Sequence, residues 1–192
     1  MDLMAPANMP GNLQNTLQIV IEGRLSRNGL YTAQYCQDRI KEVCQGFLQQ
    51  PINEFIPPPR GFGVDIWLKK DGVNYFFDTK TVQSNVGGYT KCFNQILNWY
   101  SYFYSQFPEE QASARIVFPY NPYGDQDFWA KTIVRGWPME PNSEGWVQDQ
   151  FWDFCSGVEN TYDIIYESFN SISETGDLEE IIQEIFYGNR GE

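Results

Sequence analysis

The chain has 192 residues, of which 42% are hydrophobic and 17% aromatic, a composition that suits one domain with a substantial core. It contains no histidine, which excludes Ser-His-Asp hydrolysis and histidine-dependent nucleases. Its first residues lack a basic and apolar leader, and no stretch approaches the ~18 uninterrupted apolar residues of a membrane span. We therefore expect a single domain over residues 1–192, located in the cytoplasm.

The formal net charge of −12 is concentrated in the C-terminal part of the chain. Residues 140–192 contain 13 acidic side chains and one basic side chain, whereas residues 1–139 contain 12 of each. Phosphate binding depends on Lys and Arg, so an evenly acidic protein would be a poor partner for nucleic acid. The uneven distribution leaves room for a nucleic-acid-binding face in the N-terminal part, and we interpret the acidic part as a solvated helical surface.

The elements expected before residue 64 are two helices and an irregular segment. Residues 13–25 and 31–50 carry apolar side chains at helical spacing. Residues 54–63 contain three consecutive prolines, which remove backbone donors and force an extended geometry. This segment is expected to lead the chain into a pair of strands.

The elements expected after that strand pair alternate between helix and strand and end in helices. An aromatic helix is predicted over residues 89–107 and a short buried strand over residues 114–118. The loop that follows begins with "PYNPYGDQDFW". Weaker helical patterns occur at residues 149–156, 160–172 and 178–187.

The strand pair itself, "VDIWLKKDGVNYFFDTKTV", places three charged side chains on one face. An Asp-Gly pair at 71–72 predicts a two-residue turn, and this turn sets the register of the two strands. In that register Asp65 faces Asp78, and Lys80 shares their face because side chains alternate with period 2. Like charges placed opposite each other destabilise a sheet, so the arrangement requires a cation.

One lysine leaves the two carboxylates with an excess negative charge, which a hard divalent ion would neutralise. Mg²⁺ typically takes one or two carboxylates together with water and phosphate oxygens, so we expect it at Asp65 and Asp78. Such an ion polarises a phosphate and lowers the pKa of a bound water, as phosphodiester hydrolysis requires. Lys80 would orient or deprotonate the water, or neutralise the developing charge.

Longer segments carry a resemblance to known nucleases. The order helix, strand with Asp, strand ending in DxK, helix, strand resembles the core of the PD-(D/E)xK nuclease superfamily, with Val64 in place of the motif's proline. "NEFIPPPRGFGVDIWLKKDGVNYFFDTKTVQ", "QILNWYSYFYSQFP", "ARIVFPYNPYGDQDFW" and "DQFWDFCSG" are similar to the TdeIII-type family of type II restriction endonucleases and cover most of residues 53–160. Ser84 departs from the proline expected in relatives.

The resemblance implies an α/β fold and a catalytic site. The fold would be a restriction-endonuclease-like core with a central mixed sheet flanked by helices, the core spanning about residues 31–120 and the acidic helical part about residues 140–192. Asp65 and Asp78 would bind Mg²⁺ with the backbone carbonyl of Thr79, and Lys80 would be the catalytic lysine.

Members of this superfamily often add an acid from the helix before the strand pair. Glu42 is the expected candidate, with Glu22 second, and a plain surface glutamate is the alternative for either. Gln83 and Gln95 are further candidates for supporting the site, although an exposed helix position is the preferred interpretation of Gln95.

DNA contacts are expected from basic side chains near the strand pair and in the following loop. Lys and Arg read guanine edges and bind phosphates, and a solvated side chain is the alternative at each position. The loop "PYNPYGDQDFWAKTIVRGW" is the expected place for base readout. The candidates are Arg60, Lys69, Lys91, Arg115, Lys131 and Arg135.

The resemblance implies a bacterial type II restriction endonuclease that cuts double-stranded DNA at a short GC-rich palindrome of GGNCC type. Two-fold symmetry in such a site favours a homodimer, and the host would need a cognate DNA methyltransferase. One alternative is a catalytically idle acidic interaction domain with a nuclease-like fold. A second alternative is a repair nuclease without sequence preference.

Overall fold

The computed structural model describes residues 2–81 and 83–175 of the chain. The chain divides into two compact units, one from Met1 to Val147 and one from Gln148 onward. The first unit contains the whole of the predicted catalytic core, and the second contains predicted acidic helices. The expectation that all residues act as one nuclease domain stays a prediction.

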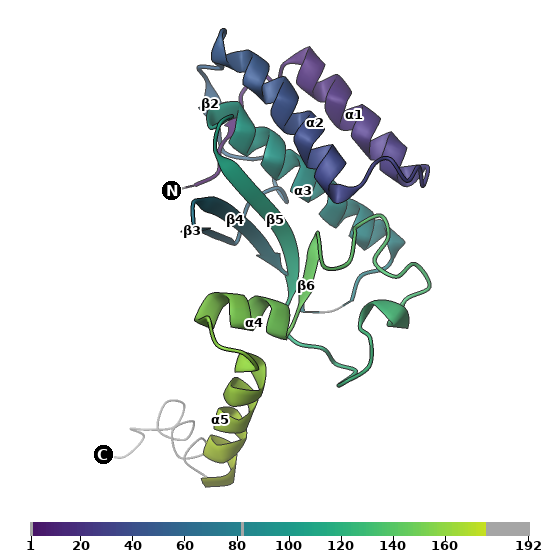
Figure 1. The fold of residues 1–192 in the computed structure, drawn as a ribbon, viewed down its shortest axis with the longest axis vertical. Coiled ribbons are helices and arrows are strands. Elements are labelled where there is room, and N and C mark those ends of the chain that lie inside the picture. Colours follow the sequence, from purple (N-terminus) through teal and green to yellow (C-terminus); the bar gives the residue numbers. More distant parts are fainter. Residues whose placement is uncertain (1, 82, 176–192) are drawn as a thin grey trace, which may run out of the picture. The chain divides into compact units, whose positions relative to one another are not determined.

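Three long helices dominate the first unit: α1 (Gly11–Leu25), α2 (Ala33–Gln45) and α3 (Val86–Gln106). They pack side by side (Figure 1), and all three were expected, α1 and α2 from apolar spacing and α3 as an aromatic helix. α2 is shorter than expected, because a 3-10 turn, η1 (Gly46–Leu48), follows it. No helix in the described part of the chain combines the length and the apolar character needed to cross a membrane.

The first unit also contains a four-stranded sheet in the order β3 (Ile66–Lys70), β4 (Val73–Thr79), β5 (Gln111–Phe118), β6 (Gly145–Val147). β3 and β4 are antiparallel, whereas β4 with β5 and β5 with β6 are parallel. The predicted α/β class with a mixed central sheet is therefore confirmed. β6 and the small pair β1 (Ala5–Pro6) and β2 (Phe55–Ile56) lie outside the predicted elements, because two or three residues carry too little periodicity to be recognised.

The turn between β3 and β4 has the predicted residues and sets the predicted register. Asp71 and Gly72 have φ values of 51° and 80°, the left-handed conformations that a two-residue type I′ turn requires at both positions. Ile66 faces Phe77 at the far end of the ladder. The register that brings the charged residues together is thus confirmed along the strands.

One face of β4 and β5 packs against α3 and forms the core. Phe76 and Ile116 are fully buried on this face, among aromatic side chains of α3 such as Phe93 and Phe103. Side chains alternate along a strand, so Asp78 lies on the same face as Phe76. The carboxylate of Asp78 therefore points from the end of β4 toward the helix layer.

A buried ion pair fixes the long connection between β5 and β6. Arg24 of α1 donates to Glu144 across 3.1 Å and to the carbonyl of Pro138 across 2.9 Å. Burial raises the pKa of Glu144 to about 7, and the guanidinium of Arg24 acts against this shift. Removing one partner of such a pair typically costs about 3–5 kcal/mol, so the end of the connection is firmly attached to α1.

The second unit contains α4 (Asp149–Ser156) and α5 (Thr161–Thr175), which were both predicted. Asp153 of α4 accepts a hydrogen bond of 2.8 Å from the backbone nitrogen of Thr161, so a side chain of one helix caps the start of the next. The third predicted helix of this part, at residues 178–187, lies outside the described residues.

Candidate active site

A cavity of about 360 Å³ lies where β4 ends, between the loop before β3 and the N-terminal end of α3. Asp65, Asp78 and Lys80 line it together, as the register predicts. Gly63 contributes from the loop and Lys91 from α3. The cavity is therefore built from three separate segments of the chain, each of which contributes a charged side chain.

Asp65 lies one residue before β3 and is held by the end of β4. Its Oδ2 accepts a hydrogen bond of 3.0 Å from the backbone nitrogen of Thr79 and one of 3.3 Å from the Thr79 hydroxyl. Burial acts to raise the pKa of Asp65, but these hydrogen bonds and the neighbouring Asp78 outweigh it, and the pKa is lowered. Asp65 is thus stabilised as a carboxylate.

Asp78 is the buried member of the pair, only 6% exposed. Its Oδ2 forms an ion pair with Nζ of Lys80, and the backbone nitrogen of Lys80 donates to the carbonyl of Val117 across 2.8 Å. Burial raises the pKa of Asp78, and the charge of Asp65 adds to this while Lys80 opposes it. The two aspartates are therefore pushed in opposite directions, which is typical of functional carboxylate pairs.

The first turns of α3 form the opposite wall of the cavity. Asn85 caps the helix by accepting a hydrogen bond of 2.9 Å from Gly88, and the partial positive charge of the helix N-terminus faces the cavity at Ser84 and Gly88. Lys91 is exposed one turn further on, and no described carboxylate lies within ion-pair distance of it. Its charge is available to an anion that enters the cavity.

Gln95 takes a different position from the exposed one that was preferred for it. It is 5% exposed, lines the cavity and donates to the carbonyl of Gly63 across 3.2 Å. Gln83 lies outside the cavity lining, where it donates to Phe128 and accepts a hydrogen bond of 2.9 Å from Tyr123. Gln95 fixes the loop before β3, and Gln83 attaches the loop after β5 to the segment that follows Lys80.

The two glutamates expected from the preceding helices do not line the cavity. Glu42 is exposed and forms an ion pair with Arg39, one turn earlier on α2. Glu22 of α1 accepts a hydrogen bond of 2.8 Å from Gln18. Among the described residues no group of three or more Cys, Asp or Glu side chains is placed to hold a metal ion. The carboxylates at the cavity are therefore the Asp65 and Asp78 pair.

The basic candidates for DNA contact are distributed over several surfaces. Arg60 is exposed beside the cavity-lining Gly61. Lys131 and Arg135 are exposed on the connection after β5. Arg115 pairs in register with Phe77, so it lies on the opposite face of the sheet from Asp78.

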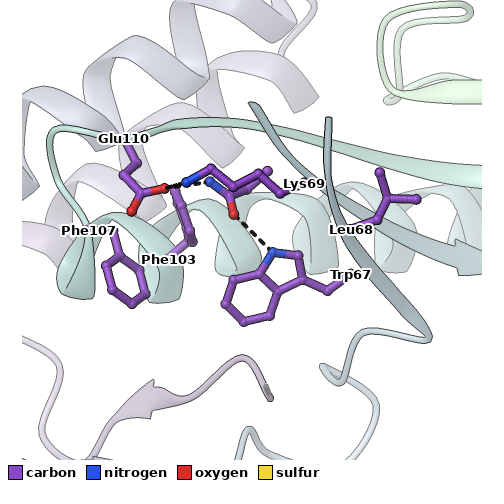
Figure 2. Close-up of a pocket in the computed structure, with 7 residues that line it drawn as sticks. Trp67, Leu68, Lys69, Phe103, Phe107 and Glu110 are labelled. Atoms are coloured by element: carbon purple, nitrogen blue, oxygen red, sulfur yellow. Dashed lines mark hydrogen bonds and ion pairs between the residues drawn. The ribbon is translucent and has the colours of Figure 1, made fainter. Parts of the chain in front are cut away.

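Lys69 lies at the turn end of the hairpin, away from the carboxylate pair. Its Nζ is 2.7 Å from Glu110, which also accepts a hydrogen bond of 2.8 Å from Asn74. Figure 2 shows this network closing one side of a pocket formed by Trp67, Phe103 and Phe107. The Trp67 indole donates to Asn74 across 3.1 Å, so Lys69 belongs to a hydrogen-bonded network of its own.

The chemistry of the cavity fits a hard divalent cation. Its donors are carboxylate oxygens, one of them almost fully buried, and a single ammonium pairs with them. Mg²⁺ prefers oxygen ligands and keeps open positions for water and phosphate oxygens. Two carboxylates, a paired lysine and an anion-attracting helix N-terminus are the components that phosphodiester hydrolysis uses.

Comparison with protein families decides the class. The family model described as type II restriction endonuclease, HinfI, matches residues 15–173, which include every strand of the main sheet and the whole cavity. The chain belongs to the HinfI family of type II restriction endonucleases. No curated protein and no solved structure matches the chain.

Membership of the HinfI family confirms the expected restriction-endonuclease-like fold and the nuclease class. Within that class, we expected the TdeIII-type family. The family match supports a restriction endonuclease but does not support this narrower assignment. The region matched includes Asp65, Asp78 and Lys80 but does not by itself assign their roles. Their roles rest on the geometry of the cavity.

Proposed function

We propose that the protein is a type II restriction endonuclease that hydrolyses phosphodiester bonds of double-stranded DNA at a specific site, with Mg²⁺ bound by Asp65 and Asp78. The observation that carries the proposal is the convergence of both aspartates and Lys80 in one cavity. Membership of the HinfI family supplies the reaction class. The opposite pKa shifts of the two aspartates support a catalytic role for the pair.

Each side chain has a distinct part in this proposal. Asp65 is held in place by Thr79, whose backbone carbonyl is the proposed third protein ligand of the metal. Lys80 is anchored through its backbone to β5, so its ammonium is positioned to orient the attacking water or to neutralise charge on the phosphate. Bound Mg²⁺ would polarise the phosphate and lower the pKa of a coordinated water.

Lys91 and the N-terminus of α3 are the proposed phosphate-binding wall. Lys91 reaches the cavity with no carboxylate partner in the described part of the chain, and the helix N-terminus adds a favourable potential for an anion. A DNA phosphate lying between this wall and the aspartates would meet positive charge on one side and the metal on the other. Arg60 is proposed to contact the backbone beside it.

The remaining features of the proposal follow from the class. The enzyme would act as a homodimer with one active site for each strand, in the bacterial cytoplasm, and a cognate methyltransferase would protect the host DNA. The GGNCC type of recognition site rests on the TdeIII-type resemblance alone. Glu42, which is paired with Arg39, would need to change partner to join the metal site.

The test is cleavage of phage-length duplex DNA by the purified protein, with Mg²⁺ and with Mg²⁺ replaced by a chelator. We expect discrete fragments only with Mg²⁺, and sequencing of their ends gives the recognition site. Lys80→Ala should abolish cleavage, whereas Lys70→Ala, an exposed lysine at the turn end of the same hairpin, should leave it intact.

Three outcomes would contradict parts of the proposal. Uncut DNA under every condition would favour a catalytically idle interaction domain. A smear in place of discrete bands would identify a nuclease without sequence preference. Equal activity of Lys80→Ala and the wild type would remove the cavity from the mechanism while leaving the family assignment in place.

A further inference from the structure

The connection between β5 and β6 exposes one isoleucine completely. Ile133 has a relative exposure of 105%, whereas the next most exposed large apolar side chain among the described residues, Phe169, reaches 65%. A β-branched apolar side chain gains nothing from full hydration. The side chain is therefore fully available to a partner that would cover it.

The backbone around Ile133 is held by consecutive tight turns. Arg135 donates to the carbonyl of Thr132 across 3.1 Å, and Trp137 donates to Val134 across 2.9 Å. Ile133 occupies the tip of the first of these turns. Its exposure is thus a property of a hydrogen-bonded turn.

A buried indole supports the turn from below. Trp129 is 8% exposed and belongs to the core cluster. Gly136 has a φ of 85°, and a Cβ atom at this position would lie 2.7 Å from the Trp129 ring, so the chain can pass this close only with glycine. Val134 packs against the core on the inner side. The turn is seated on the core, and its outer residue is Ile133.

Two cations flank the exposed isoleucine. Lys131 and Arg135 are both exposed, and no acidic residue occurs from Phe128 to Met139. Ile133 therefore lies between two exposed basic residues in the chain, and the ammonium of one of them, Lys131, donates to Gln126 and lies over the ring of Tyr123. An apolar residue between basic residues is the pattern with which DNA-binding proteins insert an apolar side chain between base pairs and hold the flanking phosphates.

The turn belongs to the same edge of the sheet as the catalytic cavity. β4 and β5 are parallel, so the connection leaves β5 at the edge where Asp78 and Lys80 lie, and Lys80 is bonded to Val117 there. The base of the connection is joined to the segment after Lys80 through Tyr123 and Gln83. The connection that carries Ile133 therefore begins at the end of the sheet where the cavity lies.

We propose that Ile133 is an apolar wedge that enters the base stack of bound duplex DNA, with Lys131 and Arg135 on the phosphates at either side. The inference rests on the proposed function and names a residue that would shape the recognised DNA. A second copy of the chain would be a less favourable partner for Ile133 than DNA. A two-fold contact centred on Ile133 would place the cations of one copy against those of the other.

The experiment starts from the wild-type protein and its mapped cleavage site. Ile133→Ala should lower the rate of cleavage at that site by about tenfold, the cost of losing a buried isoleucine contact. Ile133→Leu should retain most of the rate. Ile19→Ala, at an isoleucine 55% exposed on α1, is the matched control and should cleave like the wild type. None of the three should lower the melting temperature by more than a degree or so, because both isoleucines protrude into solvent.

Base unstacking is measured separately with 2-aminopurine placed at successive positions of a duplex carrying the mapped site. Lys80→Ala protein keeps this duplex intact, and binding should raise the fluorescence at one step. Adding Ile133→Ala should abolish that rise. Sedimentation velocity of Ile133→Ala should match the wild type.

The outcomes separate this inference from the proposed function. The wedge proposal is wrong if the wild-type protein cuts the DNA and Ile133→Ala cuts it equally fast. It is also wrong if the fluorescence rises at no 2-aminopurine position. In both cases the proposed nuclease activity stands. A changed oligomeric state of Ile133→Ala would instead place the side chain in a protein interface and overturn the wedge. Wild-type protein that leaves all DNA uncut would reject both.

Discussion

Each end of the β3–β4 hairpin takes part in an acid–lysine pair, with Glu110 from the segment before β5 at the turn end, and the two ends differ in how completely their charges are matched. At the turn end, Lys69 and Asn74 both bind Glu110, and Trp67 bonds to Asn74, so each polar group has a neighbour. At the other end, Lys80 alone pairs with Asp78 while Asp65 lies beside it.

The pKa shifts follow this difference. The hydrogen bonds from Lys69 and Asn74 lower the pKa of Glu110, as expected for a carboxylate whose charge is fully matched. Burial raises the pKa of Asp78, whose charge is only partly matched. A carboxylate whose charge is fully paired contributes to the stability of the fold, whereas a carboxylate whose charge is only partly paired can still bind a cation. The same residue types thus form a structural network at one end and the proposed catalytic site at the other.

The largest expected effect comes from neutralising one carboxylate at each end. Asp78→Asn should lower the single-turnover rate of DNA cleavage by on the order of a thousandfold, because the ligand set loses its buried charge. Glu110→Gln, the matched change at the turn end, should leave the rate within about twofold of the wild type. Equal losses of cleavage rate in both variants would show that the two ends of the hairpin do not differ in function.

A smaller effect is expected from pH. The raised pKa of Asp78 means that its neutral form stabilises the metal-free fold at low pH, and this contribution is lost as pH rises through that pKa. Metal binding needs the ionised form. The Mg²⁺ concentration for half-maximal cleavage should therefore fall by up to about tenfold per pH unit on the acid side of that pKa and then level off.

Glu110 supplies the control for this pH profile. Its pKa is lowered, so its ion pair is complete above the usual glutamate value and is lost only as pH falls through the lowered pKa. The pH profile of Mg²⁺ dependence should be the same in Glu110→Gln and the wild type. A profile that flattens in this variant would show that the turn end takes part in metal binding.

The smallest expected effect is the coupling between Lys69 and Glu110. A double-mutant cycle with Lys69→Ala and Glu110→Ala, measured by denaturant unfolding, should give a coupling free energy of about 0.2–1 kcal/mol. Both side chains are partly exposed, so solvent screens the pair. The coupling should shrink in high salt. A coupling several times larger would mean that the turn end is a rigid structural site and not a screened surface pair.

The hairpin could be predicted from the sequence because its determinants are local. Asp71 and Gly72 specify the turn, the turn sets the register, and the period of two then places Asp78 and Lys80 on one face. The resemblance to nucleases adds the reaction class. Turn type, strand register and side-chain alternation depend on neighbouring residues, so they can be predicted from the sequence.

Features that depend on packing between distant segments could not be predicted. The side of α2 that faces the sheet decides whether Glu42 can reach the cavity, and its periodic pattern identifies a buried stripe without saying which strand lies beneath it. Gln95 is buried because the loop before β3 returns to meet it. The run "TIVRG" gives no sign that Ile133 is exposed, because that depends on Trp129 filling the space below the turn.

The seating of the 132–137 turns on Trp129 has a consequence for how such an enzyme can diversify. Trp129 and Val134 hold the turn from inside, whereas Lys131, Ile133 and Arg135 are exposed, and the ammonium of Lys131 donates to Gln126 in the neighbouring loop. Substitutions at the three outer positions can therefore accumulate without a loss of stability that selection would remove. Asp65 and Asp78, the proposed metal ligands, lie on other segments and are unaffected. With Ile133 in the proposed wedge role, new target sequences could be explored at this tip while the residues of the cavity stay unchanged.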